Sequence, residues 1–229
     1  MSTIASRLQA VHDRIRAAAE AAGRPPGAVR LIAVSKTFPP EAVREAAQAG
    51  QRAFGENYLQ EAQSKIEALS GLGLEWHFIG PIQSNKTRAI AQAFSWAHSV
   101  DRLRLAERLS AARPAQMAPL QICIQVNVSG EQTKSGCHPD QVVDLAIAAA
   151  RLPGLRLRGL MAIPEPTPDN QRQRQRFALL RQTCEDLRAR GLELDTLSMG
   201  MSDDLEAAIA EGATMVRVGR AIFGARERR

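Results

Sequence analysis

The feature that most constrains this chain is an alternation of short apolar segments with helical segments along the whole sequence. Eight apolar segments have the β-branched and aliphatic character of buried strands, and short links join each one to a helical pattern. These strand candidates span residues 29–37, 52–57, 74–80, 94–100, 120–128, 155–163, 195–200 and 214–224. Such alternation implies parallel strands with right-handed crossovers, and eight of them can close a barrel without a free edge.

The expected fold class is therefore α/β: a (β/α)8 TIM barrel forming a single domain over residues 1–229, with an extra N-terminal helix. One apolar stripe predicts that extra helix, which Gly23 ends; the stripe consists of Ile4, Leu8, Val11, Ile15 and Ala18. We expect Asp101 to cap the helix after the fourth strand. A doubly wound open sheet is the alternative, but its first βα turn is usually glycine-rich, and here that turn reads "SKTFPP".

Composition restricts the class of protein further. Hydrophobic residues make up 45% of the 229 residues and aromatic residues only 4%, so the core must be aliphatic. No apolar run approaches the roughly 20 residues of a membrane span, and charges are spread through the first helical segment. We expect a cytoplasmic, monomeric protein with no membrane contact.

Neither the cysteines nor the net charge indicates a metal site or a nucleic-acid site. Cys123, Cys137 and Cys184 are odd in number and contain no CxxC pair, so we expect reduced packing residues and no metal. The net charge of +6 makes a nucleic-acid-binding module conceivable. The densest basic run, residues 172–182, lies in an amphipathic helical pattern, and we interpret it as a solvated helix face.

Lys36 stands at the end of the first apolar run, which is an unusual place for a lysine. The other three lysines are Lys65, Lys86 and Lys134, and each lies in a helical or loop segment that gives it an expected route to water. A lysine held among apolar groups can have a depressed pKa, and a neutral amine can form a Schiff base with an aldehyde. Pairing with a phosphate, or extension of the amine into water, is the alternative.

Polar and flexible residues gather where the other strands end, and in a barrel those ends form the functional face. Barrels commonly hold phosphate with the loops after strands seven and eight. Here the first of these loops has Gly200 and Ser202, with Ser202 a candidate helix cap, and the second has Gly219 and the Arg220 backbone. A plain cap and a packing glycine are the alternatives.

Arg217 is expected to point into the barrel, because Val216 and Val218 on either side of it suit the opposite face of a strand. A buried guanidinium needs a partner, which could be an aromatic ring nitrogen or a carboxylate. A lysine for an aldehyde, loops for a phosphate and an arginine for a pyridine nitrogen together describe pyridoxal 5′-phosphate (PLP) as the cofactor.

Several long sequence motifs together resemble those of a known protein family. The segments "AVSKT", "FGENY", "EWHFIGPIQSNK", "KSG", "RGLMAI", "GMSDDLEAAI" and "MVRVGRAIFGAR" occur in this order. They resemble the pyridoxal phosphate homeostasis protein family, whose single-domain barrel is related to the N-terminal domain of alanine racemase. The resemblance implies PLP binding and a role in intracellular vitamin B6 homeostasis without an established catalytic reaction.

By position, the resemblance implies that Lys36 carries the Schiff base and that Arg217 meets the pyridine nitrogen. It places Ser202, Gly219 and Arg220 around the phosphate, where Gly200 permits close approach of the backbone and the Ser202 hydroxyl could bond a phosphate oxygen. Many relatives have a small hydroxyl residue where this chain has Arg220, so only a backbone contact is expected there. The residues implied to line the ring are Asn57, His77 and Met199, with a hydrogen-bonded core histidine as the alternative for His77.

Other functions remain open at this point. A PLP-dependent amino-acid racemase needs bases on both faces of the substrate, but Tyr58 is the only tyrosine and the additional β-domain is not expected. An arginine at the ring nitrogen also makes the ring a poorer electron sink. A Schiff-base aldolase on the same fold is a further alternative. The main expectation is a carrier that binds PLP and passes it to PLP-dependent apoenzymes.

Overall fold

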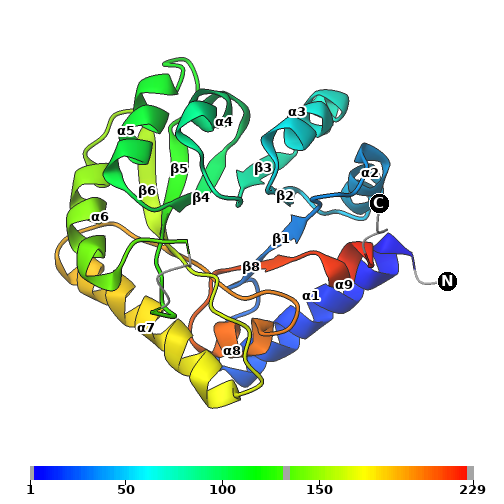
Figure 1. The fold of residues 1–229 in the computed structure, drawn as a ribbon. Coiled ribbons are helices and arrows are strands. Elements are labelled where there is room, and N and C mark those ends of the chain that lie inside the picture. Colours follow the sequence, from blue (N-terminus) through cyan, green and yellow to red (C-terminus); the bar gives the residue numbers. More distant parts are fainter. Residues whose placement is uncertain (1–2, 131–134, 226–229) are drawn as a thin grey trace.

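A closed barrel of eight parallel strands forms the centre of the protein, as the sequence predicts (Figure 1). The computed structural model describes residues 3–130 and 135–225. Neighbouring strands pair in chain order, and β8 pairs with β1 to close the barrel. The strands are β1 Arg30–Val34, β2 Ala53–Glu56, β3 Glu75–Phe78, β4 Trp96–Val100, β5 Leu120–Gln125, β6 Leu155–Met161, β7 Thr196–Ser198 and β8 Met215–Val218.

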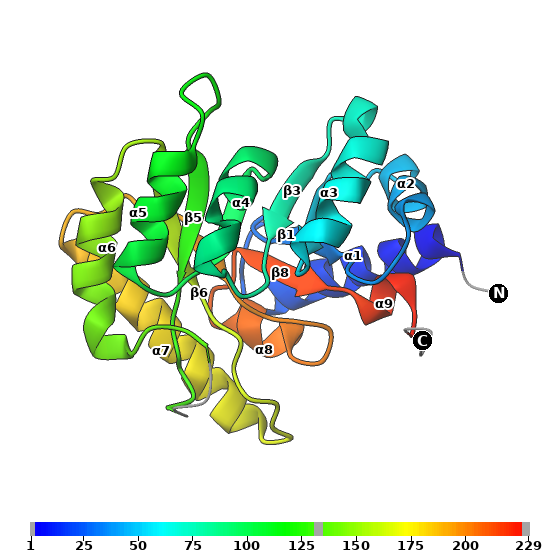
Figure 2. The same cartoon turned by 45° about the horizontal axis from the view of Figure 1, so that its top comes forward.

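Helices surround this barrel, and one of them precedes the first strand (Figures 1 and 2). The extra helix α1 packs against α8, α9 and α2 on the outside of the barrel. The helices are α1 Ile4–Ala21, α2 Pro40–Gln48, α3 Leu59–Ala68, α4 Thr87–Ala93, α5 Leu103–Ala112, α6 Val142–Ala150, α7 Asn170–Ala189, α8 Leu205–Ala210 and α9 Arg220–Phe223. Short 3-10 turns span Ser70–Leu72, Ser84–Lys86 and Pro139–Gln141.

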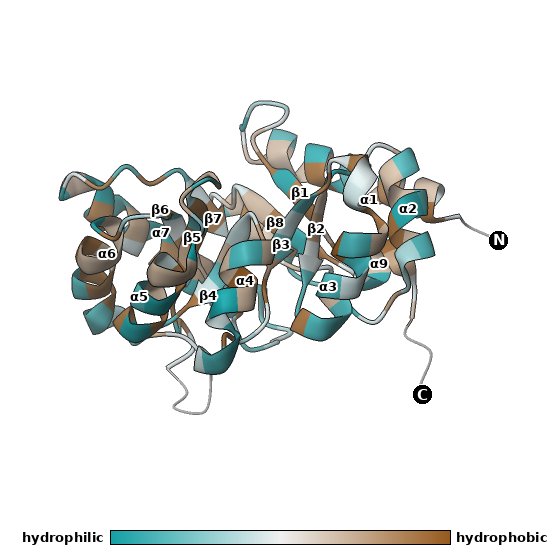
Figure 3. Cartoon of the chain, turned by 90° about the horizontal axis from the view of Figure 1, so that it is seen from above, coloured by the Kyte–Doolittle hydropathy of each residue, from teal (hydrophilic) through white to brown (hydrophobic). Residues whose placement is uncertain are grey.

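The strands divide the apolar core into two parts. The larger part lies between strands and helices and contains alternate strand residues such as Trp76 and Phe78. In Figure 3 the outer helices carry both apolar and polar segments, as helices with one buried face do. The smaller part lies inside the barrel and consists of Ile32, Ala53, Trp96, Cys123, Met161 and Met215. Hydrogen-bonded polar side chains, among them His77, His98 and Arg217, also lie inside the barrel.

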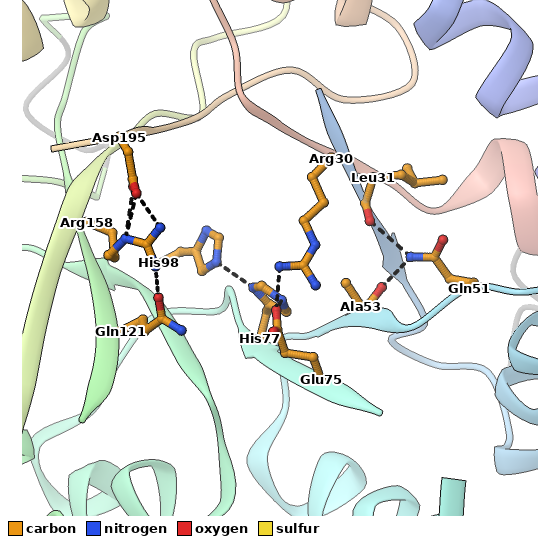
Figure 4. Close-up of polar contacts among 10 residues, drawn as sticks. All are labelled: Arg30, Leu31, Gln51, Ala53, Glu75, His77, His98, Gln121, Arg158 and Asp195. Carbon is orange, nitrogen blue, oxygen red and sulfur yellow. Dashed lines mark hydrogen bonds and ion pairs between the residues drawn. The ribbon is translucent and has the colours of Figure 1, made fainter. Parts of the chain in front are cut away.

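Charged and amide side chains fill the end of the barrel where the strands begin (Figure 4). Arg30 pairs with Glu75 at 2.8 Å, and Arg158 donates from Nε to Asp195 at 2.9 Å. Gln51 donates to backbone carbonyls of β1 and β2 at 3.0 and 2.7 Å. These contacts give the polar side chains at that end hydrogen-bond partners within the protein. We therefore expect the functional face at the opposite end, where the strands end.

Two expected helix caps are wrong. α5 begins at Leu103, after Arg102, and the Asp101 carboxylate pairs with the Arg102 guanidinium at 2.7 Å instead of capping the helix. α8 begins at Leu205, so Ser202 lies before the helix and not at its cap. The Asp204 carboxylate accepts a hydrogen bond from the Met201 N–H at 2.6 Å, and this turn delays the start of α8.

The three cysteines are free and buried, and burial raises the pKa of each thiol, which makes them packing residues as expected. In the part of the chain that is described, no helix is long and apolar enough to span a bilayer. The same residues contain no cluster of histidine, cysteine and carboxylate side chains suited to a metal ion.

Candidate functional site

A cavity of about 520 Å³ lies where the strands end. It lies at the end of the barrel opposite the charged cluster of Figure 4, and segments after β1, β2, β3, β6, β7 and β8 contribute to it. Its lining residues are Val34, Lys36, Asn57, Ile79, Ile163, Met201, Ser202, Asp203, Arg217, Gly219, Arg220 and Ala225. A second hollow is lined mostly by polar residues of α7, together with Glu211 after α8, and contains none of the expected site residues.

Lys36 lies on a tight turn directly after β1, and its side chain is half-buried at the cavity. The turn is closed by the Phe38 N–H, which donates to the Ser35 carbonyl at 3.1 Å. Thr37 has a φ of 70°, a left-handed conformation that is unfavourable for a β-branched residue. The turn therefore places Lys36 at the cavity with a strained backbone next to it.

Asn57 brings a polar atom to the cavity from the end of β2. Its Oδ1 is buried and accepts no hydrogen bond from any described residue. Gly80 lies against the Asn57 backbone so closely that an added Cβ would be 2.3 Å from the Asn57 carbonyl oxygen. A buried acceptor without a partner is costly, so Asn57 is suited to a ligand that donates a hydrogen bond or brings a bound water.

The loops after β7 and β8 offer backbone donors. Within the described residues, the N–H groups of Ser202, Gly219 and Arg220 donate to no protein acceptor. Gly200 shapes the first of these loops, because its φ is 95° and an added Cβ would lie 2.7 Å from that of Ala208. Backbone N–H groups without a protein acceptor can bind an anion, so this wall of the cavity suits a phosphate.

The Arg220 side chain forms an ion pair with another residue that lines the cavity, Asp203. Its guanidinium pairs with the Asp203 carboxylate at 2.7 Å, and both side chains are largely exposed. A backbone contact of residue 220 to a ligand stays an expectation.

Arg217 points into the barrel, as the alternation along β8 predicts. Val216 and Val218 belong to the outer core, and the guanidinium donates to the Ser198 hydroxyl at 2.7 Å and to the Ala162 carbonyl at 2.9 Å. Burial lowers the pKa of Arg217 to about 10, so the group is still charged at neutral pH. Its described partners are neutral oxygens, and the side chain also lines the cavity, where it can donate to a ligand.

Three of the expected residues do not line the cavity. His77 lies fully inside the barrel, where it stacks on Trp96 and is bonded to Glu75 and His98 at 2.6 and 2.9 Å. Met199 belongs to the outer core. Gly200 shapes the loop after β7 but is not in contact with the cavity.

Sequence reasoning also missed functional neighbours. Lys65 was expected to reach water, but it is buried beneath the Lys36 turn, with only 2% of its surface exposed. Its position three residues after Ala62 and four before Leu69 puts it on the apolar face of α3, a signal that the sequence did contain. Ile79 and Ile163 add apolar walls to the cavity. Lys134 lies outside the described residues.

The fold and the site together define a class of protein: a (β/α)8 barrel with a cavity at the ends of its strands, between a lysine after β1 and the loops after β7 and β8. The family described as "Alanine racemase, N-terminal domain" matches residues 6–227 of this chain. The chain belongs to this family and, within it, to the pyridoxal phosphate homeostasis proteins.

Relatives of known name support this membership over the whole chain. The pyridoxal phosphate homeostasis protein of Pseudomonas aeruginosa is 63% identical over 227 residues, covering 99% of this chain and 97% of the relative. That of Escherichia coli K12 is 54% identical over 233 residues, covering 99% and 98%.

Solved structures give the same family and the same fold. PipY of Synechococcus elongatus, solved with PLP bound, has a TM-score of 0.86 and 39% identity, covering 97% of this chain and all of PipY. Alanine racemase of Corynebacterium glutamicum has a TM-score of 0.68 at 20% identity, covering 94% of this chain and 60% of that enzyme. The second comparison shows the common barrel only.

Proposed function

We propose that this protein binds PLP as a Schiff base on Lys36 and takes part in intracellular PLP homeostasis. The observation that carries the proposal is the cavity at the ends of the strands, where Lys36, Arg217 and the loops after β7 and β8 surround one space. The names of the curated relatives and the PLP-bound structure of PipY support the same cofactor.

The residues present suit each part of that cofactor. The phosphate would be held by the N–H groups of Ser202, Gly219 and Arg220, which have no acceptor among the described residues. Arg217 would donate to the pyridine nitrogen, and Asn57 supplies a buried oxygen without a partner for a ring substituent. His77 and Met199 lie behind the surface of the cavity, so we propose no direct contact for them.

PLP supplies an aldehyde, and the chemistry is a condensation. The Lys36 nitrogen forms a C=N bond to the aldehyde carbon, and the aldehyde oxygen leaves as water, so no further reactant is needed. Because the link is hydrolysed by the reverse step, the cofactor can be released. Arg217 keeps its positive charge next to the ring and does not protonate it, which favours storage over electron-withdrawing catalysis.

The test is to add PLP to the purified protein, record the imine absorbance, and reduce with borohydride. Peptide mapping should find the reduced cofactor on Lys36. Lys36→Ala protein should be colourless, whereas the control Lys86→Ala, which changes a lysine outside the cavity, should be as yellow as the wild type. Equal colour in the Lys36→Ala protein would overturn the assignment.

A racemase is the second candidate function, since the barrel is that of alanine racemase. It is less favoured, because the single tyrosine, Tyr58, is exposed and does not line the cavity. Incubating the PLP-loaded protein with single amino-acid enantiomers tests this directly. Formation of the opposite enantiomer would establish the racemase and reject a pure carrier.

Delivery to other proteins is part of the proposal. We propose that the monomer releases PLP to PLP-dependent apoenzymes. Mixing the loaded protein with a PLP-dependent apoenzyme should restore that enzyme's activity faster than free PLP at the same free concentration does. Size-exclusion chromatography with light scattering should give the mass of one chain.

A further inference from the structure

Among the lysines that the structure describes, Lys65 of α3 is the buried one, and its ammonium group is fully hydrogen-bonded. It donates to the Ser35 carbonyl at 2.7 Å, to Glu56 Oε1 at 2.7 Å and to Glu61 Oε1 at 2.5 Å. An ammonium group has three donors, and each has one acceptor here. Lys65 is therefore fixed by three oxygens from three segments: the turn after β1, the end of β2, and α3 itself.

Lys65 and Glu61 contact the turn at the two peptide groups that flank Lys36. Lys65 binds the carbonyl of Ser35, which belongs to the peptide group before Lys36. Glu61 Oε1 accepts the N–H of Thr37, which belongs to the peptide group after Lys36, at 2.6 Å. One ion pair on α3 thus contacts both peptide groups next to Lys36.

The same turn is strained. Thr37 is the single residue other than glycine with a positive φ in the described parts of the chain. A β-branched residue in this conformation persists only when its surroundings determine it, and such strain gathers at functional sites. The Glu61 contact to the Thr37 N–H holds this conformation together with the Phe38 N–H, which closes the turn onto the Ser35 carbonyl.

Glu56 is the third charged side chain beside the turn, and its charge interacts with those of Lys65 and Glu61. Its side chain is fully buried, accepts a hydrogen bond from the Ser35 hydroxyl at 2.6 Å, and has an Oε2 without a partner among the described residues. Burial raises the pKa of Glu56, and the Lys65 charge acts against this. Removing Lys65 would leave two carboxylates beside the turn without the cation between them.

We propose that Lys65, acting with Glu61 and Glu56, is a positioning residue that holds the strained Ser35–Phe38 turn and so directs the Lys36 amine toward the aldehyde. This inference rests on the proposed Schiff base at Lys36. Lys65 would then assist imine formation at Lys36 without contacting the cofactor.

The test separates imine formation from noncovalent binding. PLP reports both, and pyridoxine 5′-phosphate, which has an alcohol in place of the aldehyde, reports binding of ring and phosphate alone. Lys65→Met should weaken PLP binding, read from the imine absorbance, by at least about tenfold, because a misplaced nucleophile loses that much or more. Pyridoxine 5′-phosphate should bind within about twofold of wild type, and the control Lys86→Met should change neither ligand.

Two further variants keep the test independent of folding. Glu61→Ala removes the acceptor of the Thr37 N–H from a partly exposed side chain and leaves Lys65 with Glu56, so it should fold and still lose PLP affinity selectively. In the Lys65→Met background, Thr37→Gly should restore most of the imine, because glycine adopts a positive φ without strain. Added stability alone would not produce this selective recovery.

The outcomes are distinct. Equal loss of both ligands in Lys65→Met and in Glu61→Ala, or unchanged PLP binding in both, would overturn the positioning role while the Schiff base stands. Wild-type protein that binds pyridoxine 5′-phosphate but forms no imine on Lys36 would instead overturn the proposed function, and the inference with it.

Discussion

His77 and His98 face each other inside the barrel, with Nδ1 of the first 2.9 Å from Nε2 of the second. The contact is one link of a chain, since His77 also reaches Glu75 at 2.6 Å and His98 reaches the Ser198 hydroxyl at 2.8 Å. Ser198 in turn accepts from Arg217. Because Arg217 can only donate and the Glu75 carboxylate can only accept, the chain has one direction, and both imidazoles carry their proton on Nε2.

This series of hydrogen bonds around His77 and His98 predicts that the stability of the folded protein depends on pH. Burial lowers the pKa of His77. Burial also lowers the pKa of His98, well below its usual value, and the charge of the neighbouring Arg217 lowers the pKa of His98 further. The unfolded histidines titrate near 6.5, so below that pH the unfolded state binds protons that the folded state does not. Stability is full above this pH and falls as the pH decreases, by about 1.4 kcal/mol per histidine per pH unit, until the folded pKa is passed.

Urea denaturation of the ligand-free protein at pH 7.5 and pH 5.5 checks this prediction. His98→Gln should lose less stability between the two pH values than the wild type, by about 1 kcal/mol. His138→Gln is the control, because His138 is exposed. The same pH dependence in all three proteins would contradict the account.

Ser198→Ala should destabilise the protein and weaken PLP binding. The substitution removes the oxygen that lies between Arg217 and His98, both of which are buried. A buried donor left without its acceptor costs about 1–3 kcal/mol. Ser64→Ala, on the exposed side of α3, should stay within about 0.5 kcal/mol. Denaturant unfolding measures both values, and equal stability of the two variants would contradict the prediction.

The barrel could be predicted from the sequence because its signals are local and repeated. Each strand is an apolar run followed by a helix, and β8 alternates so regularly that the direction of Arg217 follows from its two valine neighbours. The cavity lining at Lys36, Asn57, Ser202 and Gly219 could be anticipated for the same reason, since strand ends in a barrel meet at one face.

What could not be predicted depends on contacts between segments distant in sequence. His98 and Ser198 are 100 positions apart, and nothing near either residue indicates the hydrogen bond between them. The spacing along α3 indicates which face Lys65 occupies, but its acceptors on the turn after β1 and at the end of β2 are contacts that a helical wheel of α3 does not contain. Ser202 was wrongly expected as a cap because the competing Asp204–Met201 bond forms in the folded loop.

Gly80→Ala should disturb the ligand site through the backbone of Asn57. The new Cβ would lie 2.3 Å from the Asn57 carbonyl oxygen and 2.7 Å from its Cα, so the end of β2 must shift. Backbone shifts of this kind cost about 1–3 kcal/mol and move the Asn57 side chain in the cavity. Gly71→Ala is the matched control, because a Cβ there meets nothing within 4 Å. Denaturant unfolding and PLP titration should both separate the two variants; a fully stable Gly80→Ala protein with wild-type affinity would contradict the prediction.

Arg220→Ala should leave PLP binding nearly unchanged, although residue 220 lies at the proposed phosphate site. The guanidinium is directed at Asp203 on the surface, and an exposed ion pair of this type contributes about 0–1 kcal/mol. The backbone N–H, which remains in the variant, is the proposed phosphate donor. At one hundred times the dissociation constant, PLP should stabilise the folded state by about 2.7 kcal/mol, which corresponds to roughly 5–10 °C in Tm for a chain of this size. Thermal unfolding with and without PLP should give that shift in wild type and in Arg220→Ala and a smaller one in Lys36→Ala, whereas loss of most of the shift in Arg220→Ala would show that the side chain itself holds the phosphate.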